Sequence, residues 1–330
     1  MRPRLRQLPA GVGARILGVG SRQPEQVVTN ADIASRGVDT TDQWIRDRVG
    51  VMERRFARQD ESVVDMAVDA GAKALADAGL IPSDIDIVLV ATCTMPSPIP
   101  NAAGQTADRI GVRAAAAFDI NAACAGFCYA LGMASDMICA GSARYVLVIG
   151  AEKLSDWVDP TDRSTCIIFA DGAGAAVVGP TSEHERPGIG PIAAGSAGDL
   201  VDTIVVADRN SFIRQEGQEV YRWAITKIAP VALRALELAG LAAADIDVLV
   251  PHQANLRIIE AIAKRLRAAG AREDMVVADD IIRSGNTSSA SIPLALDHMR
   301  AEGRVRSGDL ALLVGFGAGL SYAGLAVILP

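Results

Sequence analysis

Two segments of this chain repeat each other, and the repeat limits the fold to a duplicated α/β architecture. Residues 73–89, KALADAGLIPSDIDIVL, align without gaps on residues 234–250, RALELAGLAAADIDVLV, with eight of seventeen positions identical by direct count. In each copy an Ala/Leu-rich helix ends at a glycine, Gly79 or Gly240, and a DID segment leads into an apolar strand. A period of about 160 residues is too long for a solenoid and predicts a duplicated domain.

A second pair of segments has a similar offset. Residues 142–152, SARYVLVIGAE, resemble residues 306–317, RSGDLALLVGFG, and each pattern predicts a hydrophobic strand after a helix. The stretch 179–191 is rich in glycine, proline and charge, which is typical of a joint between packed units. We therefore expect a mobile leader at residues 1–15, a first half at 16–180 and a second half at 181–330.

Composition excludes several classes of protein. The chain has 330 residues, of which 50% are hydrophobic and 22% charged, and this balance is typical of a soluble globular protein with a sizeable core. A net charge of −7 argues against nucleic-acid binding. The sequence contains no 18-residue apolar run and no signal peptide pattern. Its five cysteines form no CxxC pair, so we expect a cytoplasmic protein without a metal site.

Cys124, in AACAGFCYALG, begins a predicted helix that ends before Gly141. Apolar residues follow the cysteine at three- and four-residue spacing: Phe127, Ala130, Leu131, Ala134, Met137 and Ile138. Unpaired N–H groups and the positive end of the dipole favour a thiolate at a helix start, so we predict a lowered pKa for Cys124. The other cysteines are interpreted as small buried hydrophobic residues: Cys93, Cys128, Cys139 and Cys166.

His252 and Asn286 are the predicted partners of this cysteine. His252 follows the second repeat strand in VLVPHQAN, where α/β sheets present reactive groups, whereas His184 and His298 are interpreted as structural or solvated. Asn286, in SGNTSS, lies where a polar loop turns into another helix. The duplicated register therefore predicts Cys124 and Asn286 at pseudo-equivalent helix starts, with His252 nearby.

Two glycine-rich stretches resemble nucleotide loops but lack the required context. Neither residues 315–324, GFGAGLSYAG, nor residues 170–179, ADGAGAAVVG, have the helix and later acidic residue of a dinucleotide site or the GK[ST] of a P-loop. We expect each to lead into a strand. Tight turns there would bring backbone N–H groups near the sulfur, as in an oxyanion hole.

Taken together, AACAGFCYAL, VPHQANLRII, SGNTSSASIP and GFGAGLSYAG make the chain similar to the β-ketoacyl-acyl carrier protein synthase III family of the thiolase superfamily. The resemblance extends from about Ile16 to Pro330. It implies a five-layer αβαβα thiolase-like fold built from two duplicated halves, a homodimer, and a catalytic triad of Cys124, His252 and Asn286.

The resemblance also implies an acyltransferase activity without a cofactor. Cys124 would take an acyl group from acyl-CoA, and malonyl-acyl carrier protein would then lose CO₂ in the same cavity and condense to 3-ketoacyl-acyl carrier protein. His252 and Asn286 would donate hydrogen bonds to the enolate oxygen. The backbone N–H groups of Cys124 and Ala318 would bind the acyl oxygen. The reaction would start fatty-acid or polyketide synthesis, and the sequence does not distinguish the two.

Further residues match the family's binding surfaces. Trp44 and Arg48 match the residues around the adenine of CoA, although Val49 replaces a common threonine. The rest of the nucleotide and pantetheine tunnel matches Arg163, Gly217, Gln218, Tyr221, Ala254 and Asn255. The patch that binds the acidic carrier protein matches Arg257, Arg222, Lys264 and Arg265, for which a solvated helix face is the alternative.

Primer choice depends on a residue that the resemblance places in the neighbouring subunit's pocket, near Ile99. An aliphatic side chain in place of a large aromatic one predicts primers longer than acetyl, such as branched or medium acyl groups. Residues 199–216 would form the roof of the cavity.

Three alternatives remain. One is an acyltransferase of the same fold that does not decarboxylate. Another is HMG-CoA synthase, which needs an acidic residue where this chain has Cys93. The third is a non-catalytic thiolase-fold partner, which is disfavoured by the intact triad.

Overall fold

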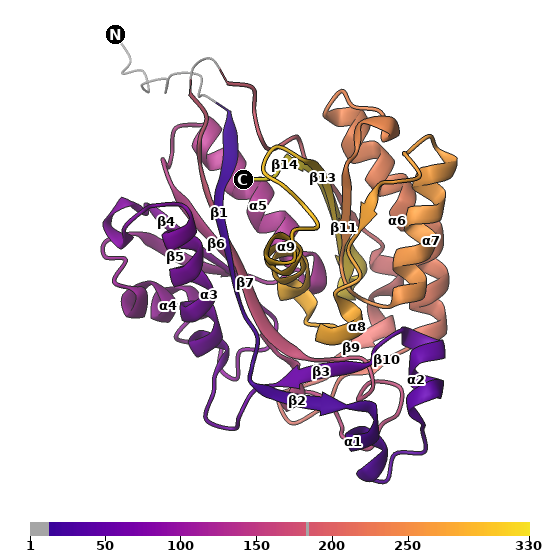
Figure 1. Ribbon diagram of the computed structural model, residues 1–330. Helices are drawn as coiled ribbons and strands as arrows, with labels where there is room; N and C mark the ends of the chain where they lie inside the picture. The colour runs from indigo at the N-terminus through magenta and orange to yellow at the C-terminus, as the bar shows by residue number, and fades with distance from the viewer. Residues whose placement is uncertain (1–12, 183–184) are drawn as a thin grey trace.

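Two five-stranded sheets stand face to face, with helices between them and on both outer faces (Figure 1). The computed structural model describes residues 13–182 and 185–330. The first sheet has the order β1-β7-β6-β4-β5, and its strands are β1 (Ala14–Arg22), β4 (Ile87–Ala91), β5 (Ala116–Ile120), β6 (Val146–Lys153) and β7 (Asp171–Pro180). The second sheet has the order β12-β11-β13-β14-β8, and its strands are β8 (Ala193–Ser196), β11 (Val248–Pro251), β12 (Val276–Val277), β13 (Leu310–Gly317) and β14 (Ser321–Ile328).

Helices complete the five layers. Two lie between the sheets, α5 (Gly126–Cys139) and α9 (Ser291–Ala301). The outer face of the first sheet is covered by α3 (Val63–Asp77) and α4 (Ala102–Ile110), and that of the second by α6 (Gly217–Leu238) and α7 (Leu256–Ala268). The predicted αβαβα order is therefore confirmed.

The two sheets repeat each other strand by strand. In the first, β4 runs parallel to β5 and β6, and β7 runs antiparallel to β6 and β1. In the second, β11 runs parallel to β12 and β13, and β14 runs antiparallel to β13 and β8. The repeated sequences lie at equivalent places, because residues 73–89 lead through a 3₁₀ turn into β4 and residues 234–250 lead through another into β11. The duplication read from the sequence is thus seen in the strand pairing.

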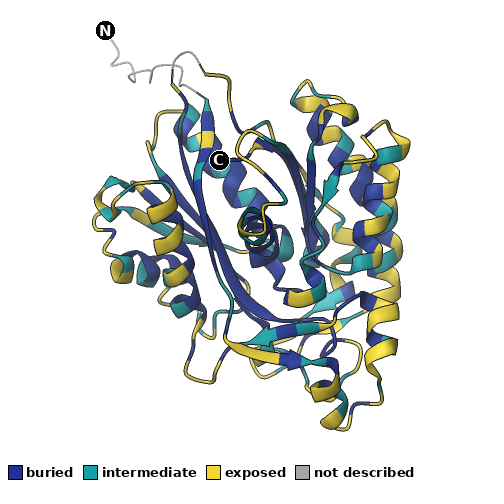
Figure 2. Ribbon diagram, viewed as in Figure 1, coloured by how far each residue is buried: buried dark blue, intermediate teal, exposed yellow. Residues whose placement is uncertain are grey.

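Burial follows from the layers (Figure 2). The parallel strand β4 is buried along its whole length because helices cover both of its faces. Helix α5 is apolar on most of its surface because it lies between two sheets. Helix α7 instead exposes Arg257, Lys264 and Arg265 to solvent and buries an apolar stripe. The buried residues of that stripe are Ile258, Ile259, Ile262, Ala263 and Leu266.

The outer and inner helices also differ in how their first turns are capped. Outer helix α3 has a capping box, in which Ser62 accepts the N–H of Asp65 and Asp65 accepts the N–H of Ser62. The inner helices α5 and α9 follow Ala125 and Ala290, and neither has a side-chain cap. Their first N–H groups are therefore free of side-chain caps where the two helices meet.

Smaller elements surround one end of the sheets. The hairpin of β2 (Gln26–Thr29) and β3 (Glu53–Phe56) packs with α1 (Asn30–Ser35), α2 (Asp42–Val49) and α8 (Ile281–Ser284). A second hairpin pairs β9 (Ile204–Val205) with β10 (Arg214–Gln215). The 3₁₀ turns are η1 (Pro82–Asp84), η2 (Ala123–Ala125), η3 (Leu154–Asp156), η4 (Gly198–Thr203), η5 (Ala243–Asp245), η6 (Ser288–Ala290) and η7 (Ala318–Leu320).

The start of the first sheet changes the expected bounds of the leader. Residues 1–12 of the predicted leader lie outside the described residues, and Ala14 and Arg15 belong to β1, where they pair with β7. Ala14 and Arg15 therefore belong to the first sheet and not to the predicted leader. None of the helices in the described part of the chain is long and apolar enough to cross a membrane.

Candidate active site

The starts of the two inner helices meet at the centre of the molecule. Turn η2 precedes α5, turn η6 precedes α9, and the two turns pack against each other. Each begins at a residue with positive φ, Ala123 at 44° and Ser288 at 50°. Aligning the two turns places Cys124 opposite Ser289, and Asn121 opposite Asn286. The predicted equivalence of Cys124 and Asn286 was therefore wrong by three residues, although both lie at helix starts.

Cys124 is half-buried and lines a cavity of about 460 Å³. The last residue of β13 lies directly beside it, because a Cβ built on Gly317 would lie 2.8 Å from the Cys124 Sγ. Ala318, the next residue, also lines the cavity. The two glycine-rich stretches belong to strands and the turn between them, as expected, since one forms β7 and the other runs from β13 through η7 into β14.

The electrostatics of the thiol differ from the prediction. Burial raises the pKa of Cys124 to about 12, the Ser288 hydroxyl and the cysteine's own N–H oppose that rise, and the Glu152 carboxylate adds to it. Desolvation therefore outweighs the helix start, and the resting residue is a thiol. Its proton must leave when the sulfur attacks.

His252 lies just after β11 and is almost fully buried. Its Nδ1 is 2.7 Å from Ser291 Oγ, and its ring meets the Phe316 ring edge to face with centroids 5.3 Å apart. Burial lowers the pKa of His252 to about 3, so the imidazole is neutral. A neutral imidazole can donate one hydrogen bond into the cavity without carrying charge.

Asn286 is buried and is held from both sides of its backbone. Its N–H donates to Ile168 O at 2.9 Å and its C=O accepts the N–H of Ala170 at 2.9 Å. The side-chain Oδ1 accepts the N–H of Ser288 at 2.9 Å, which leaves the amide NH₂ as the donor on this side chain. Cys124, His252 and Asn286 all line the same cavity, which therefore holds one thiol and two neutral donors.

Most predicted tunnel residues lie in this cavity or at its mouth. Gly217, Tyr221, Ala254 and Asn255 line the cavity, whereas Gln218 is exposed on α6 outside the lining. Two guanidinium groups lie over the Trp44 ring, with the Cζ of Arg48 at 5.5 Å and that of Arg163 at 4.7 Å from the ring centre. Arg163 also donates to the backbone oxygen of Asp39 at 2.6 Å. The contact of Asn255 Nδ2 with the Arg48 oxygen, at 3.2 Å, joins this stack to the cavity.

Several lining residues were missed by the sequence reasoning. The apolar wall includes Leu154, Trp157, Ile168, Phe169, Ile213 and Phe316. Trp157 is fixed by a hydrogen bond from its Nε1 to Thr94 O at 3.2 Å. The roof was expected at residues 199–216, and the β9–β10 hairpin of that stretch does line the cavity, with Val206, Asp208 and Arg209 in its loop. No motif marks these residues, because they come from separate loops whose meeting depends on the fold.

Other predicted residues lie outside the cavity. Ile99 is 82% exposed on a loop and does not line the cavity of its own chain. The four basic residues of the predicted carrier-protein patch are exposed on α6 and α7: Arg222, Arg257, Lys264 and Arg265. The Cζ of Arg257 lies 5.4 Å from the centre of the Tyr221 ring. Because Tyr221 lines the cavity, this contact connects the basic surface to the cavity mouth.

The remaining cysteines and histidines divide by environment. Cys128 and Cys166 are buried and Cys139 is half-buried, but Cys93 is exposed and lines the cavity. The interpretation of Cys93 as a buried hydrophobic residue was therefore wrong, because it follows β4 at the edge where the cavity begins. His298 does not line the cavity, and its Nδ1 lies 2.8 Å from Asp280 Oδ1. His184 lies outside the described residues. Among residues 13–182 and 185–330, no group of three or more His, Cys, Asp or Glu could hold a metal ion.

Comparison with known proteins supports the family that the site residues indicate. Residues 118–198 match the family model of 3-oxoacyl-[acyl-carrier-protein] synthase III, and residues 236–329 match the model of its C-terminal part. The β-ketoacyl-[acyl-carrier-protein] synthase III 4 of Streptomyces coelicolor is 49% identical over 318 residues, with 96% of this chain and 99% of the relative covered. The chain belongs to the 3-oxoacyl-[acyl-carrier-protein] synthase III family.

Solved structures agree with this family. The priming β-ketosynthase of a polyketide biosynthetic pathway superposes with a TM-score of 0.94 and 43% identity, and the match covers 99% of both chains. The 3-oxoacyl-[acyl-carrier-protein] synthase III of Aquifex aeolicus superposes with a TM-score of 0.89 and 39% identity, covering 96% of this chain and all of the other. A synthase III fold therefore accounts for nearly the whole chain.

Proposed function

We propose that this synthase III family member condenses an acyl-CoA primer with malonyl-acyl carrier protein and releases CO₂, CoA and 3-ketoacyl-acyl carrier protein. Cys124 carries the acyl group as a thioester. His252 and Asn286 bind the thioester oxygen of the malonyl group as the enolate forms. The carbanion then attacks the Cys124 thioester and frees the enzyme.

One observation carries this proposal: a thiol and two neutral hydrogen-bond donors line one apolar cavity. Loss of CO₂ leaves the electron pair on the carbon next to the thioester, so no strong base is required. The need is for donors aimed at the oxygen on which charge develops, and a donor of this kind contributes about 3 kcal/mol to the transition state. Neutral His252 and the amide NH₂ of Asn286 meet that need.

The substrates enter from the side of α2, α6 and α7. Trp44 with Arg48 and Arg163 forms a stacking platform of the kind that binds a purine base and its phosphates, which supports CoA binding there. Arg222, Arg257, Lys264 and Arg265 form an exposed basic surface at the same mouth, which supports binding of an acidic carrier protein.

The first sheet leaves an edge that a second copy of the chain would cover. Strand β5 is the last strand of its sheet and carries the half-buried side chains of Phe118 and Ile120. An edge strand with unpaired backbone groups and apolar side chains is a template for pairing. A homodimer formed there would bury this edge, and Ile99 would contact the partner's cavity and shape its primer pocket.

The test is acylation followed by condensation. Purified protein is incubated with acyl-CoA primers from acetyl to branched and long chains, and the intact mass and the modified peptide are recorded for the wild type and for Cys124→Ala. We expect one acyl group on the peptide that holds Cys124, and none in the variant. Malonyl-acyl carrier protein is then added, and CO₂ and the ketoacyl product are measured.

The outcomes separate the alternatives. Acylation with transfer to another acceptor and no CO₂ would replace the synthase by a non-decarboxylating acyltransferase. Absence of any adduct with every primer, or an adduct that survives Cys124→Ala, would overturn the nucleophile and favour a non-catalytic role. The preferred primer then identifies whether a fatty-acid or a polyketide starter step fits the enzyme.

A further inference from the structure

Arg54, on strand β3, is a fully buried arginine whose hydrogen-bond partners are all uncharged. Its Nη2 donates to Ile167 O at 2.7 Å, and its Nη1 donates to Asn30 Oδ1 at 2.8 Å and to Val28 O at 3.3 Å. Its Nε has no partner among the described residues, and no described carboxylate forms an ion pair with it. Burial lowers the pKa of Arg54 to about 10, so the side chain is still a cation at neutral pH.

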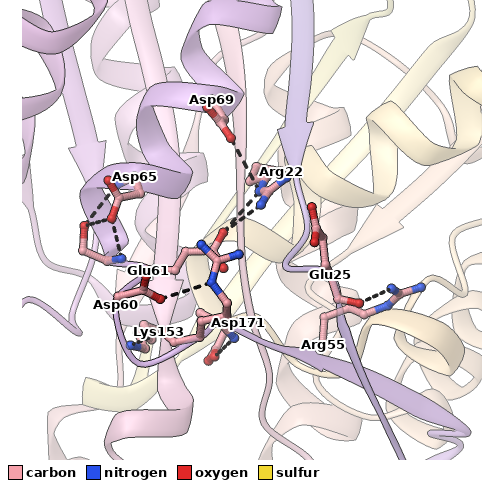
Figure 3. A network of polar contacts seen from close by, with 12 residues as sticks. Arg22, Glu25, Arg55, Asp60, Glu61, Asp65, Asp69, Lys153 and Asp171 are labelled. Atoms are coloured by element: carbon pink, nitrogen blue, oxygen red, sulfur yellow. Dashed lines mark hydrogen bonds and ion pairs between the residues drawn. The ribbon is translucent and has the colours of Figure 1, made fainter.

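Other arginines around the end of β3 have ordinary surroundings. Figure 3 shows Arg22 beside Glu61 and Asp69, and its Nη2 lies 2.9 Å from Glu61 Oε1. Arg55, the next residue of β3, is half-buried and donates to Glu25 O at 3.3 Å. Burial of a cation without a counter-ion is costly, and natural proteins keep such costly features mainly where they serve a functional site.

The segment Ile167–Ala170 connects Arg54 to Asn286. Arg54 donates to the first carbonyl of this segment, at Ile167. Asn286 is tied to the same segment by two backbone hydrogen bonds, each 2.9 Å long, and pairs with it as an isolated parallel bridge. No other side chain of the described residues hydrogen-bonds the backbone of this segment. The guanidinium of Arg54 is therefore the side-chain anchor of the backbone on which Asn286 rests.

Arg54 also contacts the residue that precedes Asn286. A Cβ built on Gly285 would lie 2.9 Å from Arg54 Cβ and 2.9 Å from Ala170 Cβ, which is closer than ordinary contact. Gly285 has a φ of 68°, a conformation that favours glycine. The chain thus turns tightly against Arg54 immediately before Asn286. Asn286 is held between two pieces of backbone, and each of them contacts Arg54.

We propose that Arg54 is a positioning residue that holds the amide of Asn286 in place for the second half-reaction. Its hydrogen bond to Ile167 O and its packing against Gly285 fix the backbone on both sides of that donor. Arg54 does not line the cavity, so it acts through Asn286 and does not touch the substrate. This role rests on the proposed function, because it concerns the donor to the enolate oxygen.

A contact on another side of Arg54 leads to the proposed CoA platform. Asn30, which accepts from Arg54, donates from its Nδ2 to Asp42 Oδ1 at 2.8 Å. Asp42 is the first residue of α2, the helix that carries Trp44. A role of Arg54 in CoA binding is therefore the competing explanation, and it predicts a higher KM for acyl-CoA with a normal rate of CO₂ release.

The test compares one substitution at two neighbouring arginines of β3. Arg54→Lys keeps the cation but replaces the rigid fork of the guanidinium by a single ammonium group. Arg55→Lys is the matched control, because Arg55 is half-buried and its hydrogen bond goes to Glu25 O. For each full-length protein we would measure the rate of Cys124 acylation, the KM for acyl-CoA, the rate of CO₂ release from malonyl-acyl carrier protein, and thermal melting.

We expect Arg54→Lys to acylate Cys124 at a nearly normal rate and to release CO₂ about 10- to 100-fold more slowly, because a small displacement of a donor has effects of this size. Arg55→Lys should behave as the wild type in both steps. In an Asn286→Ala background, Arg54→Lys should cause no further loss of CO₂ release, since the donor through which it acts is already gone. A merely structural role would lower the rate by the same factor in both backgrounds.

Three results would overturn the proposal: equal losses in acylation and CO₂ release, a raised KM with normal CO₂ release, or additive losses with Asn286→Ala. If Arg54→Lys does not fold, Gly285→Ala decides the matter. That variant changes no polar partner of Arg54 but puts a methyl group between Arg54 and the turn before Asn286. It should slow CO₂ release and spare acylation, and a normal rate of CO₂ release contradicts the role.

The two proposals fail in different ways. If the wild type and Arg55→Lys release no CO₂, the proposed function is wrong, and the role of Arg54 falls with it. If both release CO₂ and folded Arg54→Lys does so at the same rate, the proposed function stands and only the role of Arg54 is refuted.

Discussion

The Oγ atom of Ser291 lies 2.7 Å from the Nδ1 of His252, and this contact decides which nitrogen of the imidazole donates into the cavity. Ser291 Oγ also accepts the N–H of Gln253 at 3.3 Å. When the Ser291 hydroxyl donates its proton to Nδ1, the hydrogen of the neutral ring is on Nε2. The first residue of α9 thus orients a donor that follows β11.

Replacing His252 should separate the two half-reactions. His252→Ala removes one donor to the enolate and is expected to slow CO₂ release by about 10²- to 10³-fold. Acyl labelling of Cys124 should continue, because the enolate to which His252 donates forms only in the second half-reaction. Release of CO₂ from malonyl-acyl carrier protein measures the loss, with His298→Gln, outside the cavity, as the control. Equal losses in both half-reactions would contradict this division of roles.

The same histidine should make the fold sensitive to acid. His252 has a pKa of about 3 in the folded chain and about 6.5 when unfolded, so protons bind the unfolded state first as the pH falls below 6.5. The resulting loss of unfolding free energy between pH 7 and 5 is about 2 kcal/mol. Urea denaturation of the wild type and of His252→Gln measures it. The variant should lose about 2 kcal/mol less over that range, and identical losses would refute the lowered pKa.

Gly317 should tolerate no side chain. A Cβ there would lie 2.8 Å from Cys124 Sγ and 2.7 Å from Cys124 Cβ, both shorter than ordinary contact. We expect Gly317→Ala to reduce the rate of Cys124 acylation by at least about 100-fold, because small displacements at a reacting atom have effects of that size. Gly198→Ala is the matched control, since a Cβ at Gly198 meets open space. Normal acylation in Gly317→Ala would show that the backbone moves away at little cost.

Trp157 should limit the size of the primer. Its indole forms part of the apolar wall and is fixed by Thr94 O at 3.2 Å. Trp157→Val should enlarge the pocket and shift the preference toward longer or more branched primers by about 10-fold in kcat/KM, the scale of one or two methylenes in a pocket. Trp157→Phe keeps an aromatic ring but loses the hydrogen bond, and it should change the preference less. Competition between acyl-CoA pairs gives the ratio directly.

Residues at the Trp44 ring should affect the binding of acyl-CoA and leave the chemical step unchanged. Arg163 lies 4.7 Å from the Trp44 ring centre, outside the cavity that holds Cys124. We expect Trp44→Ala and Arg163→Ala to raise KM for acyl-CoA by about 10-fold, with little change in kcat, because the contact is the same in ground and transition states. Arg283→Ala, at an exposed arginine elsewhere, serves as the control. A fall in kcat with constant KM would contradict a binding role.

The sequence predicted those features that depend on local pattern or on repetition. The five-layer fold followed from the repeat and the family motifs, and Cys124, His252 and Asn286 lie together as the motifs indicated. The thiol pKa was predicted in the wrong direction, because helix position can be read from spacing but burial cannot. Trp157 was missed for the same reason: it lines the cavity beside residues far away in the chain, such as Phe316.

The alignment of the two halves gives every experiment on this enzyme an internal reference. Cys124 is opposite Ser289, Gly317 is opposite Glu152, and the place of His252 in the second half is held by Ala91 in the first. A substitution at a site residue can be compared, in the same molecule, with one at its counterpart in the other half. Such twin variants occupy equivalent places in the strand pairing, so their comparison separates the effect of position in the fold from the chemistry of the site.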